Sequence, residues 1–261
     1  MSQTEKKDLA LVSNEAEGYD SSAIITLDPR AHIRERPGMY IGYVGNGEHQ
    51  DDGIYVLLKE VIDNSIDEFT MGNGRKVDIS VDEDQLVRVR DYGRGIPLDK
   101  VLECVSKINT GGKFITGSDG QQRAFSSSIG LNGVGLKAVN FLSEHFKATS
   151  WRDGKACSVI FSEGLLLSEK TFDSDEENGT EIEFLPSKEI FNDFHFDFKF
   201  IKRRMQHYSW LSSGLTLICN GERYYSRRGL LDLLDSKLES DGLYDVIHYK
   251  SDTMEFAFTH T

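Results

Sequence analysis

Apolar residues recur along the chain at two spacings, which separate the expected helices from the expected strands. A spacing of three and four residues predicts helices over 28–36, 52–70, 98–108, 135–146, 198–212 and 230–240. Alternation of apolar and polar residues predicts strands in 75–91, 146–151, 156–162, 165–171, 180–185, 215–225 and 253–261. Because hairpin-linked strands are segregated from helices, we expect an α+β fold, a two-layer sandwich in which helices cover one face of a mostly antiparallel sheet.

Local signals mark the ends of several of these elements. Asp28 is an expected N-cap with Pro29 in the first helical position, and the Pro-Gly pair at 37–38 predicts the end of that helix. The Asn-Gly pair at 220–221 predicts a type I′ turn between two short strands. These signals support the order of elements that the spacing gives.

The pattern divides the chain into three segments. Residues 1–18 are polar and mixed in charge without periodicity, so we expect a mobile tail. Residues 19–228 carry the patterns of one domain. After them a helical pattern precedes a lone strand pattern, and a lone strand needs partners that this chain is not expected to supply. Residues 229–261 are therefore expected to be the truncated start of a second domain.

Composition and charge narrow the possible functions of the 261-residue chain. A formal net charge of -13 and a pI near 5.0 argue against binding nucleic acid by phosphate neutralisation and against adhesion to an anionic membrane. Cys104, Cys157 and Cys219 are odd in number and far apart, which argues against a disulfide framework or a zinc site. With neither a signal peptide nor a long apolar run, the sequence predicts a soluble, cytoplasmic protein.

The expected helix over 52–70 contains the stretch "KEVIDNSIDE", which is both amphipathic and acidic. Glu60 and Asn64 are one turn apart and point the same way, with Asp67 and Glu68 on the same side. This face could simply be solvated. It could also be part of a nucleotide site, in which an Asn amide oxygen binds a hard cation and a carboxylate takes a proton from water. Asp63 is expected to cap the helix or face solvent.

Two glycine-containing segments are further candidates for that chemistry. In "DYGRGIP", Asp91 ends a strand before Gly93 and Gly95, where a carboxylate could accept from an adenine amine and the glycines could let a flat ring approach, although Asp before Gly is also ordinary turn chemistry. In "GLNGVGLKAV", glycines precede a helix and suit either an anion or a tight turn. Residues 109–129 between them are rich in Gly and Ser and are expected to form a lid.

Taken together and in order, these motifs resemble the GHKL ATPase superfamily, and more closely the ATPase domain of bacterial type IIA topoisomerase B subunits, of DNA gyrase and topoisomerase IV. The matching segments are "YDSSAI", "RERPGMYIG", "EVIDNSIDE", "DYGRGIP", "NTGGKF", "GLNGVGLKAVN" and "NGTEIEFLPS". They span residues 19–186, and the similarity runs on to about residue 230. The resemblance implies the GHKL (Bergerat) ATP-binding fold and Mg²⁺-dependent ATP hydrolysis.

The resemblance also implies a role for individual residues. Glu60 matches the general base, Asn64 the ligand of Mg²⁺, and Asp91 the carboxylate that reads adenine, supported by Thr180 through a shared water. Glu68 and Arg152 are expected to form an ion pair near the pocket. The full set of nucleotide-binding residues that it implies is Tyr19, Asn64, Asp67, Glu68, Asp91, Gly93, Arg94, Gly95, Ile96, Pro97, Lys113, Gly130, Leu131, Asn132, Gly133, Val134, Gly135, Arg152 and Thr180.

Partners follow from the same resemblance. It implies a homodimer of B subunits, formed when ATP is bound, through an N-terminal arm that includes Tyr19 and Ile24. The topoisomerase A subunit would complete the enzyme, and DNA would be bound by regions outside this chain. Tyr92 and Asn132 depart from the residues common in gyrases, and the phosphate-sensing Lys of the family lies beyond Thr261. A nucleotide-gated dimerisation module with little turnover is therefore an alternative for this chain.

Overall fold

The computed structural model describes residues 27–110, 133–251 and 254–261. The expected tail 1–18, the N-terminal arm and most of the expected lid lie outside the described residues. The helical elements are α1 (Pro29–Glu35), α2 (Gly38–Ile41), α3 (Gly53–Thr70), η2 (Leu98–Lys100), α4 (Val101–Ser106), α5 (Gly135–Phe141), α6 (Lys188–Phe191), α7 (Phe198–Leu211) and α8 (Leu230–Asp235). The strands are β1 (Lys76–Val81), β2 (Val87–Asp91), β3 (Ser143–Arg152), β4 (Lys155–Ser162), β5 (Leu165–Asp173), β6 (Gly179–Pro186), β7 (Thr216–Cys219), β8 (Glu222–Tyr224), β9 (Ile247–Lys250) and β10 (Glu255–Phe258).

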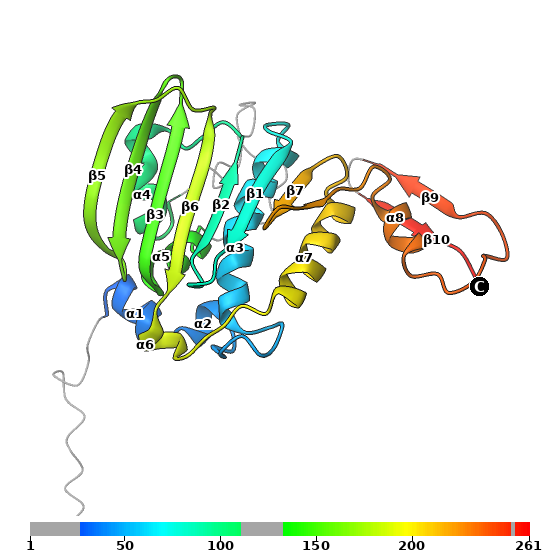
Figure 1. The fold of residues 1–261 in the computed structure, drawn as a ribbon, viewed down its shortest axis with the longest axis horizontal. Coiled ribbons are helices and arrows are strands. Elements are labelled where there is room, and N and C mark those ends of the chain that lie inside the picture. The colour runs from blue at the N-terminus through cyan, green and yellow to red at the C-terminus, as the bar shows by residue number, and fades with distance from the viewer. Residues whose placement is uncertain (1–26, 111–132, 252–253) are drawn as a thin grey trace, which may run out of the picture.

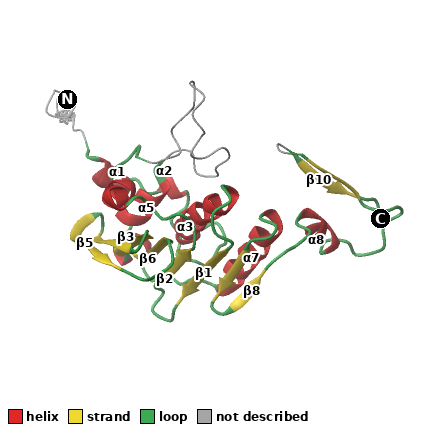
Figure 2. Ribbon diagram, turned by 90° about the horizontal axis from the view of Figure 1, so that it is seen from above, coloured by secondary structure: helices red, strands yellow, loops and turns green. Residues whose placement is uncertain are grey.

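Strands β1 to β8 form one sheet in the order β5-β4-β3-β6-β2-β1-β7-β8. Within this described sheet, β1 and β7 pair in parallel and the other neighbours pair antiparallel. Figure 1 shows the strands side by side, and Figure 2, seen from above, shows the helices gathered on one face of the sheet. The expected two-layer α+β sandwich is confirmed.

The main core lies between α3 and the strands it covers. Ile54, Leu58 and Ile62 of α3 are fully buried, as their spacing of four residues predicts for one helix face. Val87 and Val89 of β2 are buried toward the same side because alternate residues of a strand share a face. Truncating one of these helix side chains to Ala is expected to cost about 2–5 kcal/mol of stability. The core therefore fixes α3 against β2, which matters for the site.

Two predicted local features are confirmed, the N-cap of α1 and the turn between β7 and β8. The Asp28 carboxylate accepts from the backbone N–H groups of Arg30 and Ala31, at 2.9 and 3.2 Å, so it caps α1. The turn between β7 and β8 has φ of 46° at Asn220 and 82° at Gly221, as a type I′ turn requires.

Two predicted helix ends are wrong: the helix expected over 230–240 ends at Asp235, and the helix expected over 135–146 ends at Phe141. The helical spacing over 135–146 continues beyond Phe141, but the observed helix ends there and Ser143 begins β3. Phe146 is fully buried, and its backbone is paired with Phe161 of β4 on one side and Phe184 of β6 on the other. Pairing on both edges satisfies the backbone of this segment more completely than one further helical turn would.

The expectation of a lone strand near the C-terminus is also wrong. Strand β10 pairs antiparallel with β9, whose residues the alternation did not single out. The rings of Tyr249 and Phe256 stack across this hairpin with centroids 5.4 Å apart. The hairpin lies apart from the main sheet (Figure 1), while the domain boundary at residue 229 stays a prediction.

Candidate functional site

Asp91, at the end of β2, is a buried carboxylate held by backbone donors. It is 7% exposed, and its Oδ1 accepts from the N–H of Gly93 at 2.9 Å and from the N–H of Thr180 at 3.3 Å. Burial, helped by the nearby Glu68 charge, raises the pKa of Asp91 to about 6, although the bond from Gly93 and the charge of Arg90 act to lower it. In the described residues both bonds go to Oδ1, so Oδ2 is the oxygen available to a ligand.

The glycines after Asp91 are needed for close packing rather than for flexibility alone. A Cβ on Gly93 would lie 2.9 Å from Oε2 of Glu68 and 3.0 Å from Oδ1 of Asp91. Gly95 has φ of +74°, and a Cβ there would lie 2.5 Å from the carbonyl oxygen of Trp151. A side chain at Gly93 would therefore obstruct the space beside the Asp91 carboxylate, and one at Gly95 would collide with the backbone of β3. The adjacent Ile96 is half-buried and Pro97 is exposed.

The predicted ion pair between Glu68 and Arg152 is wrong. The two carboxylate oxygens of Glu68 accept from the guanidinium of Arg94, Oε2 from Nε at 3.0 Å and Oε1 from Nη2 at 2.9 Å. Glu68 Oε2 also accepts the backbone N–H of Arg94 at 3.2 Å. Arg152 instead lies 3.6 Å from the carboxylate of its neighbour Asp153. Arg94 rather than Arg152 pairs with Glu68 because the Arg94 backbone already contacts the Glu68 carboxylate, so its guanidinium lies close enough to form both bonds.

Glu60 and Asn64 lie further along the same face of α3. The Asn64 amide nitrogen donates to the carbonyl oxygen of Glu60 at 2.7 Å, which directs the amide group along the helix. A Cβ on Gly135, the first residue of α5, would collide with the Glu60 carboxylate. The motifs "KEVIDNSIDE" and "GLNGVGLKAV" therefore meet here, and Gly133 and Val134 come immediately before α5.

The other two acids of α3, Asp63 and Asp67, are both buried. Asp63 is 4% exposed and accepts from Lys59 Nζ at 2.6 Å and from the Tyr208 hydroxyl of α7 at 2.5 Å. Asp67 is 1% exposed. The prediction that Asp63 caps the helix or faces solvent is wrong, because Lys59 and Tyr208 supply the partners that a buried carboxylate requires. Lys59 Nζ also lies 3.8 Å from the Glu60 carboxylate.

The site has two ends, and each is defined here by the residues that form it. The base end comprises Glu68, Asp91, Gly93, Arg94 and Thr180, and the phosphate end comprises Glu60, Asn64, Gly133 and Gly135. Because residues four apart on a helix share a face, Glu60, Asn64 and Glu68 lie along one face of α3, with Glu68 about 12 Å along the helix axis from Glu60 and about 6 Å from Asn64. Tyr19, Lys113, Gly130, Leu131 and Asn132 lie outside the described residues, so their predicted roles stay predictions.

Some contributors were not predicted. Arg90 packs beside Asp91 and donates to its carbonyl oxygen. Ser150 donates from its hydroxyl to the carbonyl of Ile96 at 2.8 Å and so ties β3 to the "DYGRGIP" turn. Lys137 is 3% exposed and donates to the carbonyl of Thr110 at 2.6 Å. Of these residues, only Lys137 carried a local signal in the sequence, because it is a charged residue in the middle of an otherwise apolar pattern.

The donor set suits ATP and Mg²⁺ in kind. A carboxylate oxygen directed past glycines complements an exocyclic amine, and an amide oxygen beside a carboxylate suits a hard cation that also binds phosphate oxygens. Among the described residues, no group of three His, Cys, Asp or Glu side chains could hold a metal by itself. Mg²⁺ usually binds through one or two protein ligands together with substrate phosphates.

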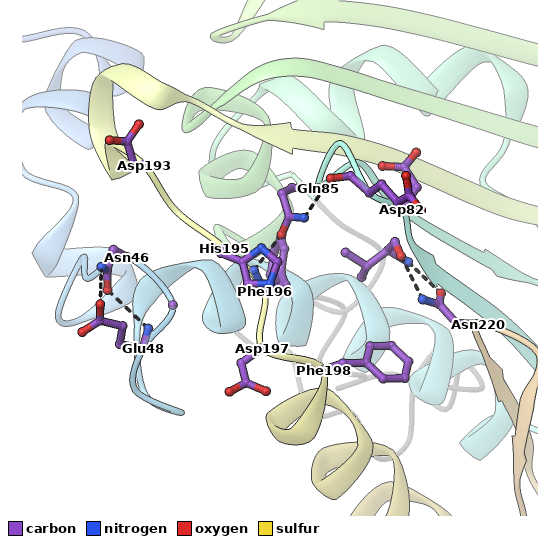
Figure 3. Close-up of a pocket in the computed structure, with 13 residues that line it drawn as sticks. Asn46, Glu48, Asp82, Gln85, Asp193, His195, Phe196, Asp197, Phe198 and Asn220 are labelled. Carbon is purple, nitrogen blue, oxygen red and sulfur yellow. Dashed lines mark hydrogen bonds between the residues drawn. The ribbon is translucent and has the colours of Figure 1, made fainter.

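A separate open cleft of about 760 Å³ lies at the other end of the β1–β2 hairpin, next to the residues that precede α7 (Figure 3). Its lining includes Glu48, Asp82, Asp193, His195 and Asn220. Gln85 and Asn220 there bond to neighbouring backbone, with Gln85 Oε1 accepting from Phe196 at 2.7 Å. None of the predicted site residues lines this cleft.

Comparison with known proteins gives three findings. The family model described as histidine kinase-, DNA gyrase B- and HSP90-like ATPase matches residues 49–190. The B subunit of DNA topoisomerase 4 from Borreliella burgdorferi is 50% identical over 246 residues, which cover 94% of this chain and 40% of that protein. The B subunit of DNA gyrase from Chlamydia muridarum is 37% identical over 220 residues, covering 78% of this chain and 26% of that protein.

A solved structure agrees with these relatives. The crystal structure of the 43K ATPase domain of Thermus thermophilus gyrase B, in complex with an aminocoumarin, matches with a TM-score of 0.70 and 26% identity. The match covers 87% of this chain and 61% of that one. The chain thus spans less than two thirds of the length of each of these relatives. None of the helices described in the structure has the length and apolar content that a membrane span requires.

Proposed function

The chain belongs to the family of histidine kinase-, DNA gyrase B- and HSP90-like ATPases, and from this premise we propose that it binds and hydrolyses ATP with Mg²⁺ as the ATPase part of a type IIA topoisomerase B subunit. The 50% identity to the B subunit of a topoisomerase 4 supports the finer assignment. ATP-driven dimerisation through the N-terminal arm, assembly with an A subunit, and strand passage through DNA bound elsewhere belong to the same proposal.

One observation carries the proposal. A single face of α3 carries Glu60 against Gly135 of α5 and Glu68 against the turn that holds Asp91. The distance along the helix between them, about 12 Å, is comparable with an extended nucleoside triphosphate. A base could therefore reach Asp91 while its terminal phosphate lies beside Glu60.

Each end of the site has a distinct task in the proposed reaction. Asp91 accepts a hydrogen bond from the adenine amine, and the absence of a side chain at Gly93 admits the ring. Asn64 would hold Mg²⁺ through its amide oxygen, and the ion would neutralise charge on the phosphates. Glu60 orients a water and takes its proton, which contributes on the order of 10²- to 10⁴-fold in rate. Lys59 Nζ lies 3.8 Å from the Glu60 carboxylate and 2.6 Å from that of Asp63, where it offsets their charge.

Gly135 belongs to this mechanism through the space that it leaves. Because it has no side chain, the Glu60 carboxylate can lie against the start of α5. The amides of Gly133 to Gly135 would then face phosphate oxygens close to the attacking water. Phosphoryl transfer depends mostly on such positioning and on charge stabilisation.

Calorimetry tests the proposal. The protein is titrated with a non-hydrolysable ATP analogue in the presence of Mg²⁺, alongside Asp91→Asn and a matched control, Asp82→Asn. Asp82 lies in the turn at the other end of the same hairpin, where it accepts from the N–H of Leu86. We expect Asp91→Asn to weaken binding by roughly 10- to 100-fold, because its amide can present a donor to the adenine amine.

The control variant should bind like the parent. A parent protein that does not bind the analogue would contradict the proposed function. Equal affinities for the parent and Asp91→Asn would remove Asp91 from the site while leaving the family membership in place.

A further inference from the structure

Arg90, the residue before Asp91, is a buried charge with an unusual set of neighbours. It is 8% exposed, and its guanidinium carbon lies 4.3 Å from the ring centroid of Trp151 and 4.7 Å from that of Tyr92. Arg88, two residues earlier on the same face of β2, is instead largely exposed and paired with Glu183 at 2.6 Å. Burial of a guanidinium is costly unless its donors are satisfied, so the contacts of Arg90 need an explanation.

The donors of Arg90 join two chain segments beyond the point where regular pairing stops. The ladder between β2 and β6 ends at the pair Arg90–Glu181. Past that pair, Nη1 of Arg90 donates to the carbonyl of Asp91, and Nη2 donates to the carbonyl of Glu177 at 2.5 Å. The guanidinium thus replaces the missing rungs between the end of β2 and the segment that leads into β6.

Gly179 makes room for this arrangement. Its φ is +143°, and a Cβ on it would collide with Nη1 of Arg90 and with the carbonyl oxygen of Asp91. The next residue, Thr180, donates its N–H to the Asp91 carboxylate. Arg90 therefore touches the backbone on both sides of the contact between Asp91 and Thr180.

Building on the function proposed above, we propose that Arg90 is a positioning residue for adenine recognition. Its guanidinium fixes the distance between the end of β2 and the loop before β6, so that the Asp91 carboxylate and Thr180 present one rigid acceptor to the base. The stack with Tyr92 and Trp151 holds the guanidinium plane in place. In this way Arg90 sets the preference for adenine over guanine without touching the nucleotide.

The charge of Arg90 adds to its geometric role. Burial and the Glu68 charge on α3 raise the pKa of Asp91, and Arg90 opposes them. Glu68 is itself engaged by Arg94. An ionised Asp91 accepts from the adenine amine but repels the carbonyl oxygen that guanine presents at the equivalent position.

The test compares the affinities of non-hydrolysable ATP and GTP analogues, measured by calorimetry with Mg²⁺. The proteins are the parent, Arg90→Met, Arg90→Lys and the control Arg88→Met. We expect Arg90→Met to bind the ATP analogue roughly tenfold more weakly, because one hydrogen bond to the base would be poorly placed. The affinity for the GTP analogue should change little. The ratio of the two affinities should fall by the same factor.

Arg90→Lys separates geometry from charge. A lysine keeps the positive charge but cannot bridge two carbonyls with one planar fork, so it should behave like Arg90→Met. The Arg88→Met protein should keep the parent's ratio. Trp151→Leu removes one of the two rings that stack on the guanidinium, so it should lower the ratio of ATP-analogue to GTP-analogue affinity by a smaller factor. This variant provides the test if both Arg90 variants fail to fold.

The outcomes distinguish this inference from the proposed function. A parent that binds the ATP analogue, with Arg90 variants that keep the parent's ratio, would overturn the positioning role alone. Equal losses for both analogues would show a merely structural role and would also overturn it. A parent that binds neither analogue would overturn the proposed function and this inference with it.

Discussion

The base end and the phosphate end of the site are built on different kinds of backbone. The base end sits where β2 and β6 meet beyond their last paired residues, and its central carboxylate is 7% exposed and held by two backbone N–H groups. The phosphate end sits on α3 and the start of α5, and the Glu60 side chain there is 30% exposed. One end is fixed by the sheet, whereas the other depends on side chains at the surface of a helix.

This difference separates binding from turnover. A buried acceptor with fixed partners can add affinity at little ordering cost, because its geometry exists before the ligand arrives. A half-exposed base contributes mainly in the transition state, where its proton transfer occurs. Substitutions at the base end should therefore change affinity, and those at the phosphate end should change the rate.

Glu60→Gln should give the largest effect. It removes the proton acceptor and keeps the size of the side chain, so kcat should fall by roughly 10²- to 10⁴-fold while the affinity for an ATP analogue changes little. Steady-state phosphate release and calorimetry measure the two quantities. A variant that hydrolyses ATP like the parent would refute the role of Glu60. It would also contradict the expectation that substitutions at the phosphate end change the rate.

Gly135→Ala should come next. The added methyl group collides with the Glu60 carboxylate and must displace it. We expect kcat to fall by about 10-fold or more, since small displacements of a catalytic group are costly. The matched control is Gly154→Ala, which has open space around the added group although its φ of +79° costs some stability. A normal kcat for Gly135→Ala would show that Glu60 has another productive position.

The pH dependence of binding probes the base end. The pKa of Asp91 is raised to about 6, so the carboxylate that accepts from adenine becomes protonated as the pH falls through 6. ATP-analogue affinity should fall up to about 10-fold between pH 7 and pH 5, where about a tenth of the group stays ionised. Asp91→Asn should lack this transition, whereas an equally steep profile in that variant would assign the titration to another group.

Stability should follow the opposite course in the nucleotide-free protein. Because the folded-state pKa of Asp91 is raised from 3.8, its contribution is fully present below pH 4 and lost as the pH rises through about 6. The amount is at most about 3 kcal/mol. Thermal unfolding of the parent and of Asp91→Asn across this window measures the difference.

Glu68→Gln should give the smallest effect. It removes the charge from the bonds to Arg94, which is partly exposed, so we expect a loss of about 1 kcal/mol of stability. It should also lower the pKa of Asp91, because the Glu68 charge raises it. The binding profile should therefore shift to lower pH. Glu103→Gln on α4, paired with two exposed lysines, is the control and should leave that profile unchanged.

Much of the fold could be predicted because its signals are local. The amphipathic spacing of α3, the cap at Asp28 and the turn at Asn220 depend on neighbouring residues alone. The end of α5 could not be predicted, since it depends on β4 and β6 pairing with Ser143–Arg152 from distant parts of the chain. Strand β9 was missed because its alternation extends over only four residues, Ile247–Lys250, too short a pattern to stand out from the loop around it.

The site divides in the same way. Asp91 and Glu60 stand in short motifs, so the sequence could single them out before any geometry was known. Arg90 and Arg88 look alike in the sequence, as alternate polar residues of one strand. Their difference comes from Trp151 and Gly179, which arrive from β3 and β6. The partner of Glu68 was misassigned for a similar reason, because ion pairing depends on which backbone lies nearest.

The Oδ2 atom of Asp91 has a consequence for inhibition. It is a pre-positioned acceptor at the base end, roughly 12 Å along α3 from the phosphate end, so an uncharged compound could use it without imitating a triphosphate. A drug-resistant strain could not readily change Asp91, because the same atom would serve the natural substrate.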